Sequence, residues 1–178
     1  MAEDQRVRVL SHRRVHSGRV LDLDVDEIEE PGGVRATREV VRHRGSVVVL
    51  AVDDRDRLVL VRQYRYPVDA TLWEIPAGRQ DAGESPEEGA RRELEEEVGV
   101  RAARLEHLLS FYASPGFCDE TMHLFRATDL VSVPARPEPD ESIESRWVTL
   151  PEARAMADRG EVRDAKTLLA VMLEERRR

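Results

Sequence analysis

The feature that most constrains the fold is a short helix, with a clear start and a clear stop, predicted between residues 85 and 98. Ser85 suits the N-cap, Pro86 suits the first helical position, and Glu88 completes a capping box with Ser85. Gly99 can adopt the left-handed conformation that ends a helix. The apolar residues recur every four positions, at Ala90, Leu94 and Val98. This spacing gives the helix a narrow apolar stripe, which we expect to face a core.

Apolar runs on both sides of this helix predict strands. Residues 46–52 read SVVVLAV, a continuous β-branched run that is typical of a strand covered on both faces. Further strands are predicted at residues 58–65, 72–77, 105–112 and 121–127, with a last one near 145–148. Helices are predicted from 149 to 160 and from 165 to 178. Between residues 6 and 41, apolar runs flank the turn Pro31-Gly32-Gly33 and predict a hairpin.

The order of these elements predicts the fold class. A chain of 178 residues suits one structural domain with a proper core. Strands, a helix, further strands and two final helices predict an α/β fold, with a mixed sheet and helices packed on its faces. We expect an N-terminal β-hairpin extension, residues 1–45, followed by the main body, residues 46–178. The extension is amphipathic and one compact domain need not cover it, so we expect it to contribute to a homodimer interface.

The composition excludes several classes of protein. The net charge of −8 opposes binding to a nucleic-acid backbone. No apolar run approaches the roughly 18 residues that a membrane span needs. Residues 1–20 also lack an apolar stretch long enough for a signal peptide. We therefore expect a cytoplasmic protein that binds neither nucleic acid nor membrane. An anionic small molecule still fits if acidic side chains gather metal ions beside it.

Three carboxylates of the predicted helix share one side of it. Glu93, Glu96 and Glu97 stand at i, i+3 and i+4, within an arc of about 100° beside the apolar stripe. Their repulsion costs on the order of a few tenths of a kcal/mol per pair, and a hard divalent cation would remove it. Arg92 precedes Glu96 by four residues and can hold one carboxylate in place, while Glu84 adds an acid before the cap. The alternative for an isolated acidic run is a solvated surface.

The sequence around these carboxylates decides between the two interpretations. Residues 78–100 read GRQDAGESPEEGARRELEEEVGV. This resembles the Nudix box: a glycine, five residues, a glutamate, seven residues, Arg-Glu, an aliphatic residue, any residue, Glu-Glu, any residue, a glycine and an aliphatic residue. The fixed places are filled by Gly78, Glu84, Arg92, Glu93, Leu94, Glu96, Glu97, Gly99 and Val100. Nine constraints over 23 positions form a highly specific signal.

The resemblance implies the family's α/β/α sandwich around a mixed β-sheet, together with a set of metal ligands. The ligands would be the carboxylates of Glu93, Glu96 and Glu97, the carbonyl of Ala77 and, as a further contributor, Glu84. The implied cofactor is Mg²⁺, with Mn²⁺ as a substitute. Arg92 and Glu96 are also assigned to the catalytic group.

Three further segments resemble the ADP-ribose pyrophosphatases within this family. Pro115 lies sixteen residues beyond the last glycine of the box, where that subfamily has a marker proline, and the run SPGFCDE ends in Glu120, which would help to hold substrate. The strand VRQYRYP would carry a phosphate-contacting arginine, Arg65. The segment REVVRHRG resembles a strand that reaches a partner subunit's site, which would place Arg38 and Glu39 near the substrate.

A catalytic base is expected outside the box, because carboxylates that hold metal ions are weak bases. A carboxylate on a loop that moves in after substrate binding suits this task better. The segment DESIESRW resembles the subfamily's acidic loop and strand, and it places the base at Glu141. Glu144 is the nearest competitor, although it should already lie on the strand. The alternative is that residues 140 and 141 only solvate a surface loop.

These features predict a Nudix pyrophosphohydrolase. The reaction is Mg²⁺-dependent hydrolysis of the pyrophosphate bond in a nucleoside diphosphate linked to a sugar. ADP-ribose is the first choice of substrate, with AMP and ribose 5-phosphate as products. Arg79-Gln80-Asp81 departs from the subfamily's pattern and leaves room for a GDP-sugar, a dinucleoside polyphosphate or a reduced nicotinamide dinucleotide. A non-catalytic nucleotide-sugar-binding module and an acidic scaffold without a ligand are the alternatives from other classes.

Overall fold

The structure is a computed structural model that describes residues 6–136 and 143–177. The chain divides into two compact units. Unit 1 comprises Met1–Gly45 and Phe111–Thr121, and unit 2 comprises Ser46–Ser110 and Met122–Arg178. Among the described residues, no helix is long and apolar enough to cross a membrane.

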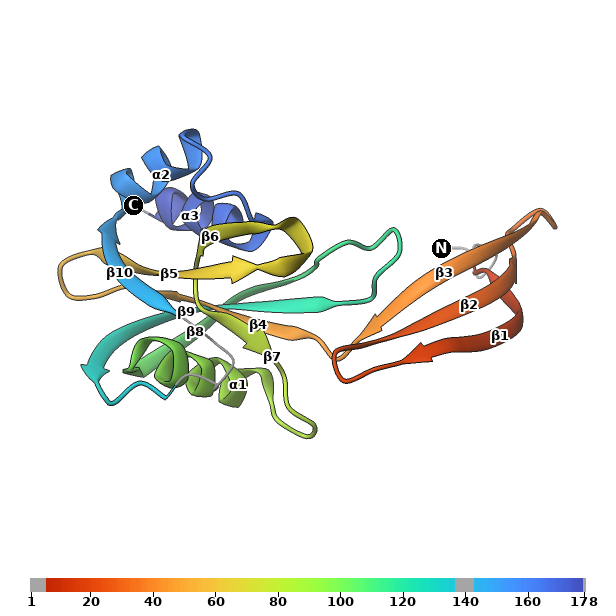
Figure 1. Cartoon of the computed structure of the whole chain (residues 1–178), viewed down its shortest axis with the longest axis horizontal. Helices are drawn as coiled ribbons and strands as arrows, with labels where there is room; N and C mark the ends of the chain where they lie inside the picture. Colours follow the sequence, from red (N-terminus) through yellow and green to blue (C-terminus); the bar gives the residue numbers. More distant parts are fainter. Residues whose placement is uncertain (1–5, 137–142, 178) are drawn as a thin grey trace. The chain divides into compact units, whose positions relative to one another are not determined.

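Unit 1 contains a three-stranded antiparallel sheet in the order β1-β2-β3 (Figure 1). The strands are β1 Arg8–Ser17, β2 Leu21–Glu29 and β3 Arg35–His43. The predicted hairpin is confirmed by β2 and β3, which flank a turn in which Gly32 and Gly33 have φ angles of 98° and 84°. Because β1 also pairs along β2, the extension is a three-stranded sheet and more than a hairpin.

Charged side chains link all three strands of unit 1. Asp24 on β2 is only 1% exposed, and it accepts hydrogen bonds from Arg14 on β1 and from Arg42 on β3. The Arg14 contact is the main reason that the pKa of Asp24 falls to about 2. A buried carboxylate that bridges two arginines therefore fixes the register of the sheet.

Unit 2 contains two sheets, in the strand orders β10-β5-β6 and β7-β4-β9-β8. Their strands are β4 Ser46–Ala51, β5 Arg57–Arg65, β6 Ala70–Glu74, β7 Ala77–Arg79, β8 Val100–Tyr112, β9 Thr121–Ser132 and β10 Glu144–Thr149. A single 3-10 turn, η2 Tyr66–Val68, joins β5 to β6. Strand β4 pairs in parallel with β9 and antiparallel with β7, so the predicted mixed sheet is confirmed.

The single strand predicted over residues 72–77 is wrong. β6 ends at Glu74 in one sheet and β7 begins at Ala77 in the other, so Ile75 and Pro76 carry the chain between the sheets. Pro76 has no N–H group for a strand ladder, which favours a break there. Its carbonyl accepts a hydrogen bond from the Val49 N–H at 2.8 Å and ties the crossing to β4.

The helix predicted between residues 85 and 98 begins and ends as predicted, but its last turn is not α-helical. Helix α1, Pro86–Glu93, has the predicted capping box: Ser85 accepts from the Glu88 N–H, and the Glu88 carboxylate accepts from the Ser85 N–H at 2.9 Å. The next turn, η3 Leu94–Val98, is a π-helix that ends at Gly99, whose φ is 70°. The α-helical spacing assumed for the three carboxylates therefore does not hold over the last turn. Such π turns are frequent at functional sites.

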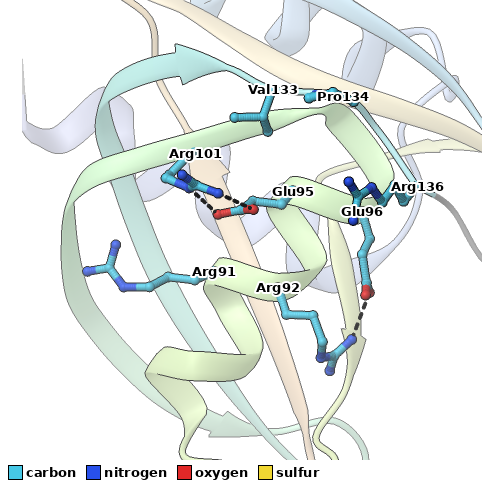
Figure 2. Close-up of a pocket in the computed structure, with 8 residues that line it drawn as sticks. All are labelled: Arg91, Arg92, Glu95, Glu96, Arg101, Val133, Pro134 and Arg136. Atoms are coloured by element: carbon cyan, nitrogen blue, oxygen red, sulfur yellow. Dashed lines mark hydrogen bonds and ion pairs between the residues drawn. The ribbon is translucent and has the colours of Figure 1, made fainter.

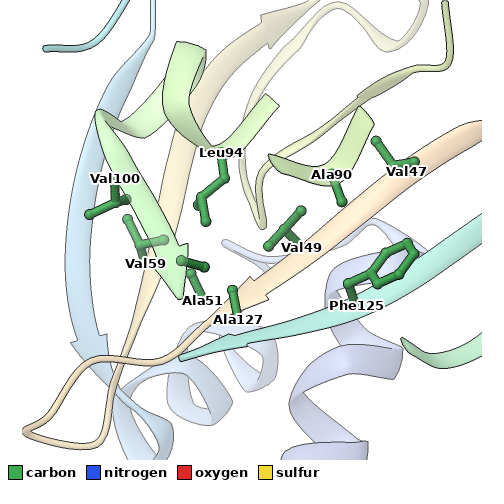
Figure 3. Close-up of a cluster of buried hydrophobic side chains, with 10 residues drawn as sticks. Val47, Val49, Ala51, Val59, Ala90, Leu94, Val100, Phe125 and Ala127 are labelled. Carbon is green, nitrogen blue, oxygen red and sulfur yellow. The ribbon is translucent and has the colours of Figure 1, made fainter. Parts of the chain in front are cut away.

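The apolar stripe of α1 packs on β4, and every residue of β4 is buried, as predicted (Figure 3). The core cluster consists of Val47, Val49, Ala51, Val59, Ala90, Leu94, Val100, Ala102, Phe125 and Ala127. Helices α2 Leu150–Asp158 and α3 Ala165–Arg177 lie on the other side of the strands from α1 (Figure 1). The predicted α/β/α sandwich is thus confirmed within unit 2.

Candidate active site

The backbone of β7 passes in direct contact with the carboxylate of Glu93. A Cβ atom added to Gly78 would lie 1.9 Å from Glu93 Oε1 and 2.0 Å from Glu93 Cδ, so any other residue here would displace the Glu93 carboxylate. Glu93 lies at the end of α1, and its side chain is 12% exposed. The first glycine of residues 78–100 therefore makes room for a half-buried carboxylate.

A second carboxylate packs on the same strand. Glu97 is 7% exposed, and its Oε2 accepts a hydrogen bond from the Ala77 N–H at 3.2 Å. The structure thus brings Ala77, Glu93 and Glu97 together where β7 meets the end of the helix. These are three of the predicted metal-binding residues.

Arg92 donates hydrogen bonds to three carboxylates of the group, including Glu93. Its Nε and Nη2 donate to Glu84 at 2.9 and 3.0 Å, and its Nη1 donates to Glu93 at 2.7 Å and to Glu96 at 3.0 Å. Nη2 also donates to the carbonyl of Arg79. The hydrogen bonds from Arg92 lower the pKa of Glu84, and those contacts raise the pKa of Arg92. Arg92 therefore keeps the Glu84 carboxylate ionised and draws Glu93 and Glu96 to the same guanidinium.

The oxygen atoms gathered here as potential metal ligands suit a hard cation. All are carboxylate or carbonyl oxygens, which Mg²⁺ prefers to nitrogen or sulfur. The three atoms nearest to the position that a Cβ at Gly78 would take all belong to the Glu93 carboxylate. Within residues 6–136 and 143–177, no three His, Cys, Asp or Glu side chains converge closely enough to hold a metal ion. The guanidinium of Arg92 lies among these carboxylates instead.

Arg65 lies at the end of β5, within electrostatic reach of this group. Its Nε and Nη2 donate to the buried Glu74 at 2.9 and 2.8 Å. These bonds are the main reason that the pKa of Arg65 is raised, and the charge of Glu97 adds to the shift. The sequence predicted Arg65 as a site residue but did not identify Glu74 as its partner.

The other predicted substrate residues belong to unit 1. Arg38 donates to Glu30 Oε1 at 2.6 Å, and Glu39 is an exposed residue of β3. Glu120 lies on a segment that pairs with β3, and its Oε1 is 3.5 Å from His43 Nδ1. The contact with His43 was not predicted, although His43 belongs to the segment REVVRHRG. Unit 1 therefore contains Arg38, Glu39 and Glu120, whereas the carboxylates and Arg65 belong to unit 2.

The predicted base, Glu141, lies outside the described residues. Its competitor Glu144 begins β10, as expected for a strand residue, and its side chain is 62% exposed beside Arg62.

A cavity of about 400 Å³ lies beside the π turn of the helix (Figure 2). Four arginines, two glutamates and the segment Val133-Pro134 form its walls. Two backbone hydrogen bonds anchor that segment to the helix end: Val133 N–H to the Gly99 carbonyl at 2.8 Å, and Arg136 N–H to the Glu96 carbonyl at 3.0 Å. A Cβ at Gly99 would lie 2.7 Å from the Val133 carbonyl oxygen, so this glycine permits the close approach.

Comparison with known proteins identifies the family of the chain. Residues 42–171 match the family model described as the NUDIX domain, and the chain therefore belongs to the Nudix family. It is 43% identical over 166 residues to an ADP-ribose pyrophosphatase from Bacillus subtilis (strain 168), which covers 92% of this chain and 90% of the relative.

Two further similarities cover nearly the whole chain. It is 40% identical over 166 residues to a methanol dehydrogenase activator from Bacillus methanolicus, with 92% and 90% coverage. The crystal structure of an ADP compounds hydrolase superposes with a TM-score of 0.86 at 25% identity, covering 99% of this chain and 96% of that one. The family and fold predicted from residues 78–100 are confirmed.

Proposed function

We propose that this protein hydrolyses the pyrophosphate bond of ADP-ribose to AMP and ribose 5-phosphate. The observation that carries this proposal is the packing of the Glu93 and Glu97 carboxylates against the backbone of Gly78 and Ala77. This packing concentrates anionic oxygen beside Arg65, so a cation and a phosphate group can be held next to each other. Similarity to the ADP-ribose pyrophosphatase over nine-tenths of its length supports the choice of substrate.

The cofactor that fits these donors is Mg²⁺, with Mn²⁺ as a substitute. The residues that would hold it are Glu93, Glu96, Glu97, the carbonyl of Ala77 and Glu84. When bound, the metal neutralises charge on the phosphate oxygens and activates water. Arg92 holds Glu84 in place and, through its hydrogen bonds to Glu93 and Glu96, would orient these two carboxylates beside the ion.

Other residues bind the substrate and move the proton. Arg65 offers a planar pair of N–H donors to a phosphate oxygen pair. Glu141 accepts the proton of the attacking water. Arg38 and Glu39 contribute to the site of a partner subunit, and Glu120 holds substrate near them.

A homodimer formed through unit 1 is part of this proposal. Strand β1 lies at the edge of its sheet, and Val9 and Val15 on it are 59% and 40% exposed. Exposed apolar side chains on an edge strand favour pairing with another chain.

A panel of nucleotide sugars and dinucleotides tests the function. Each compound is incubated with protein and Mg²⁺, and the products are separated by chromatography. We expect ADP-ribose to give the highest kcat/KM, with AMP and ribose 5-phosphate in equal amounts and no turnover in EDTA. Faster cleavage of a GDP-sugar or a reduced nicotinamide dinucleotide would show that ADP-ribose is the wrong substrate, while pyrophosphate hydrolysis would remain the reaction. No cleavage of any compound would refute the enzymatic function.

A further inference from the structure

Four charged side chains form a cluster at the end of β6, namely Arg65, Glu74, Asp164 and Lys166. Glu74 is 2% exposed, and its two oxygens accept hydrogen bonds from Arg65 Nε and Nη2 at 2.9 and 2.8 Å. The ammonium group of Lys166 also donates to Glu74. Lys166 Nζ donates to Asp164 Oδ1 at 2.8 Å as well. Two positive and two negative groups thus balance one another, and Glu74 is the most buried of the four side chains.

The cluster is held rigidly from two directions. Asp164 Oδ1 accepts the N–H of Thr167 at 3.1 Å, which fixes the first turn of α3. Thr167 Oγ1 in turn accepts the N–H of Ile75 at 2.9 Å, and Thr167 is fully buried. The start of α3 is therefore attached to the chain immediately after Glu74. This attachment leaves the Glu74 carboxylate little freedom to rotate.

A buried charge cluster of this kind is a poor way to stabilise a fold. Removing charges from water is costly, and well-packed apolar side chains of similar volume often serve stability equally well or better. Burial alone would raise the pKa of Glu74, but its bonds with Arg65 and its contact with Lys166 outweigh that effect and lower it. Glu74 thus stays ionised and keeps its two hydrogen bonds from Arg65.

The geometry leaves one edge of the arginine available. Arg65 has five guanidinium N–H groups, and the two bonds to Glu74 leave three of them, including both on Nη1. The Arg65 side chain is 37% exposed, whereas Glu74 behind it is 3% exposed. The three N–H groups that do not bind Glu74 are the two on Nη1 and the second one on Nη2, and together they suit bidentate contact with phosphate.

We propose that Glu74 and Lys166 are positioning residues that hold one edge of the Arg65 guanidinium so that the other edge meets the substrate's phosphate. This inference rests on the proposed function, because it takes Arg65 as the phosphate contact. Glu74 orients the guanidinium directly. Lys166 holds the carboxylate in place and compensates part of its negative charge while Arg65 is shared between Glu74 and the phosphate.

The chain offers a matched control in a second buried Arg–Glu pair. Arg126 on β9 donates to Glu174 on α3 through Nε at 2.9 Å and Nη2 at 3.0 Å. The Glu174 side chain is 3% exposed, as is that of Glu74. The largest electrostatic contributions to its arginine come from Glu174, Glu106 and Asp56, none of which belongs to residues 78–100. Glu174→Gln therefore removes an equivalent ion pair away from the proposed chemistry.

The test is a double-mutant cycle on Arg65 and Glu74, with ADP-ribose and Mg²⁺. We expect Glu74→Gln to raise KM about tenfold with kcat changed less than about threefold, because phosphate binding is weakened in ground and transition states alike. Lys166→Met should raise KM by a smaller factor, since Glu74 still holds Arg65. In an Arg65→Ala background, Glu74→Gln should change kcat/KM less than about twofold. Glu174→Gln should lower Tm to a similar extent as Glu74→Gln and leave both kinetic constants unchanged.

Independent, multiplicative losses in the cycle would overturn the inference, as would an equal rise in KM with Glu174→Gln. If Arg65→Ala does not fold, Arg65→Lys replaces it, because lysine also lacks the planar fork. The same cycle is measured as Kd for a nonhydrolysable α,β-methylene analogue of ADP-ribose. If the four proteins of the cycle bind this analogue with the expected coupling but the wild type hydrolyses nothing, the proposed function is refuted. The role of Glu74 in orienting Arg65 is then retained.

Discussion

Substitution of Gly78 by alanine should inactivate the enzyme without unfolding it. The new Cβ would lie 1.9 Å from Glu93 Oε1, so the carboxylate must retreat by about 1.1 Å to reach the 3.0 Å below which such contacts essentially never occur. The atoms that must move are the far end of a flexible side chain, and no positive φ is needed at Gly78, so the fold absorbs the change. A displacement of about 1 Å in a catalytic arrangement can lower the rate by about 10²-fold.

We therefore expect Gly78→Ala to lower kcat for ADP-ribose about 10²-fold and to shift Tm by less than about 4 °C. Kinetics and thermal unfolding are measured on the same preparations. In a Glu93→Asp background, where the carboxylate is withdrawn by one methylene, Gly78→Ala should have little further effect. Near-normal turnover of the single variant would refute the reasoning, and so would a full additional loss in the double variant.

Three further predictions concern other parts of the chain. Because the pKa of Asp24 is lowered from 3.8 to about 2, its ion pairs stabilise the fold above pH 3.8, and this contribution is lost as the pH falls towards 2. Tm should therefore fall less steeply between pH 3.8 and pH 2 in Asp24→Asn than in the wild type. An equally steep fall in both proteins would contradict the lowered pKa of Asp24. Glu141→Gln should lower kcat by about 10²–10⁴ with little change in KM, whereas Glu144→Gln should not; loss only with Glu144→Gln would transfer the role of base to Glu144. Light scattering should show that the wild-type protein is a dimer. Val9→Glu should dissociate the dimer and lower the activity. A monomer with full activity would rule out a site shared between subunits.

The local features of the fold were predictable from local sequence. Ser85, Glu88 and Gly99 define the helix limits through caps that act within a few residues, and the capping box is present. The run SVVVLAV predicted a strand that is wholly buried. The spacing of residues 78–100 predicted the family, because a shared metal chemistry demands fixed intervals between carboxylates.

The features that were missed depend on contacts between distant residues. Lys166 meets Glu74 across 92 positions of sequence, and nothing in either local segment indicates a partner. The crossing at Ile75-Pro76 follows from the pairing of β7 with β4, which the short run LWEIPA does not reveal. The π turn at Leu94–Val98 preserves the pattern of apolar residues and so resembles an α-helix in sequence.

The central claim is that the protein hydrolyses ADP-ribose and that the carboxylates of Glu93, Glu96 and Glu97 are needed for this reaction. The most direct measurement compares the release of AMP from ADP-ribose by the wild-type protein and by Glu97→Gln at saturating Mg²⁺. The amide retains an oxygen for the Ala77 N–H, and the side chain keeps its shape, so Tm should change little. We predict that Glu97→Gln lowers kcat by about 10²-fold or more, because an anionic ligand is lost. Near-normal release of AMP by a folded Glu97→Gln protein would contradict the account.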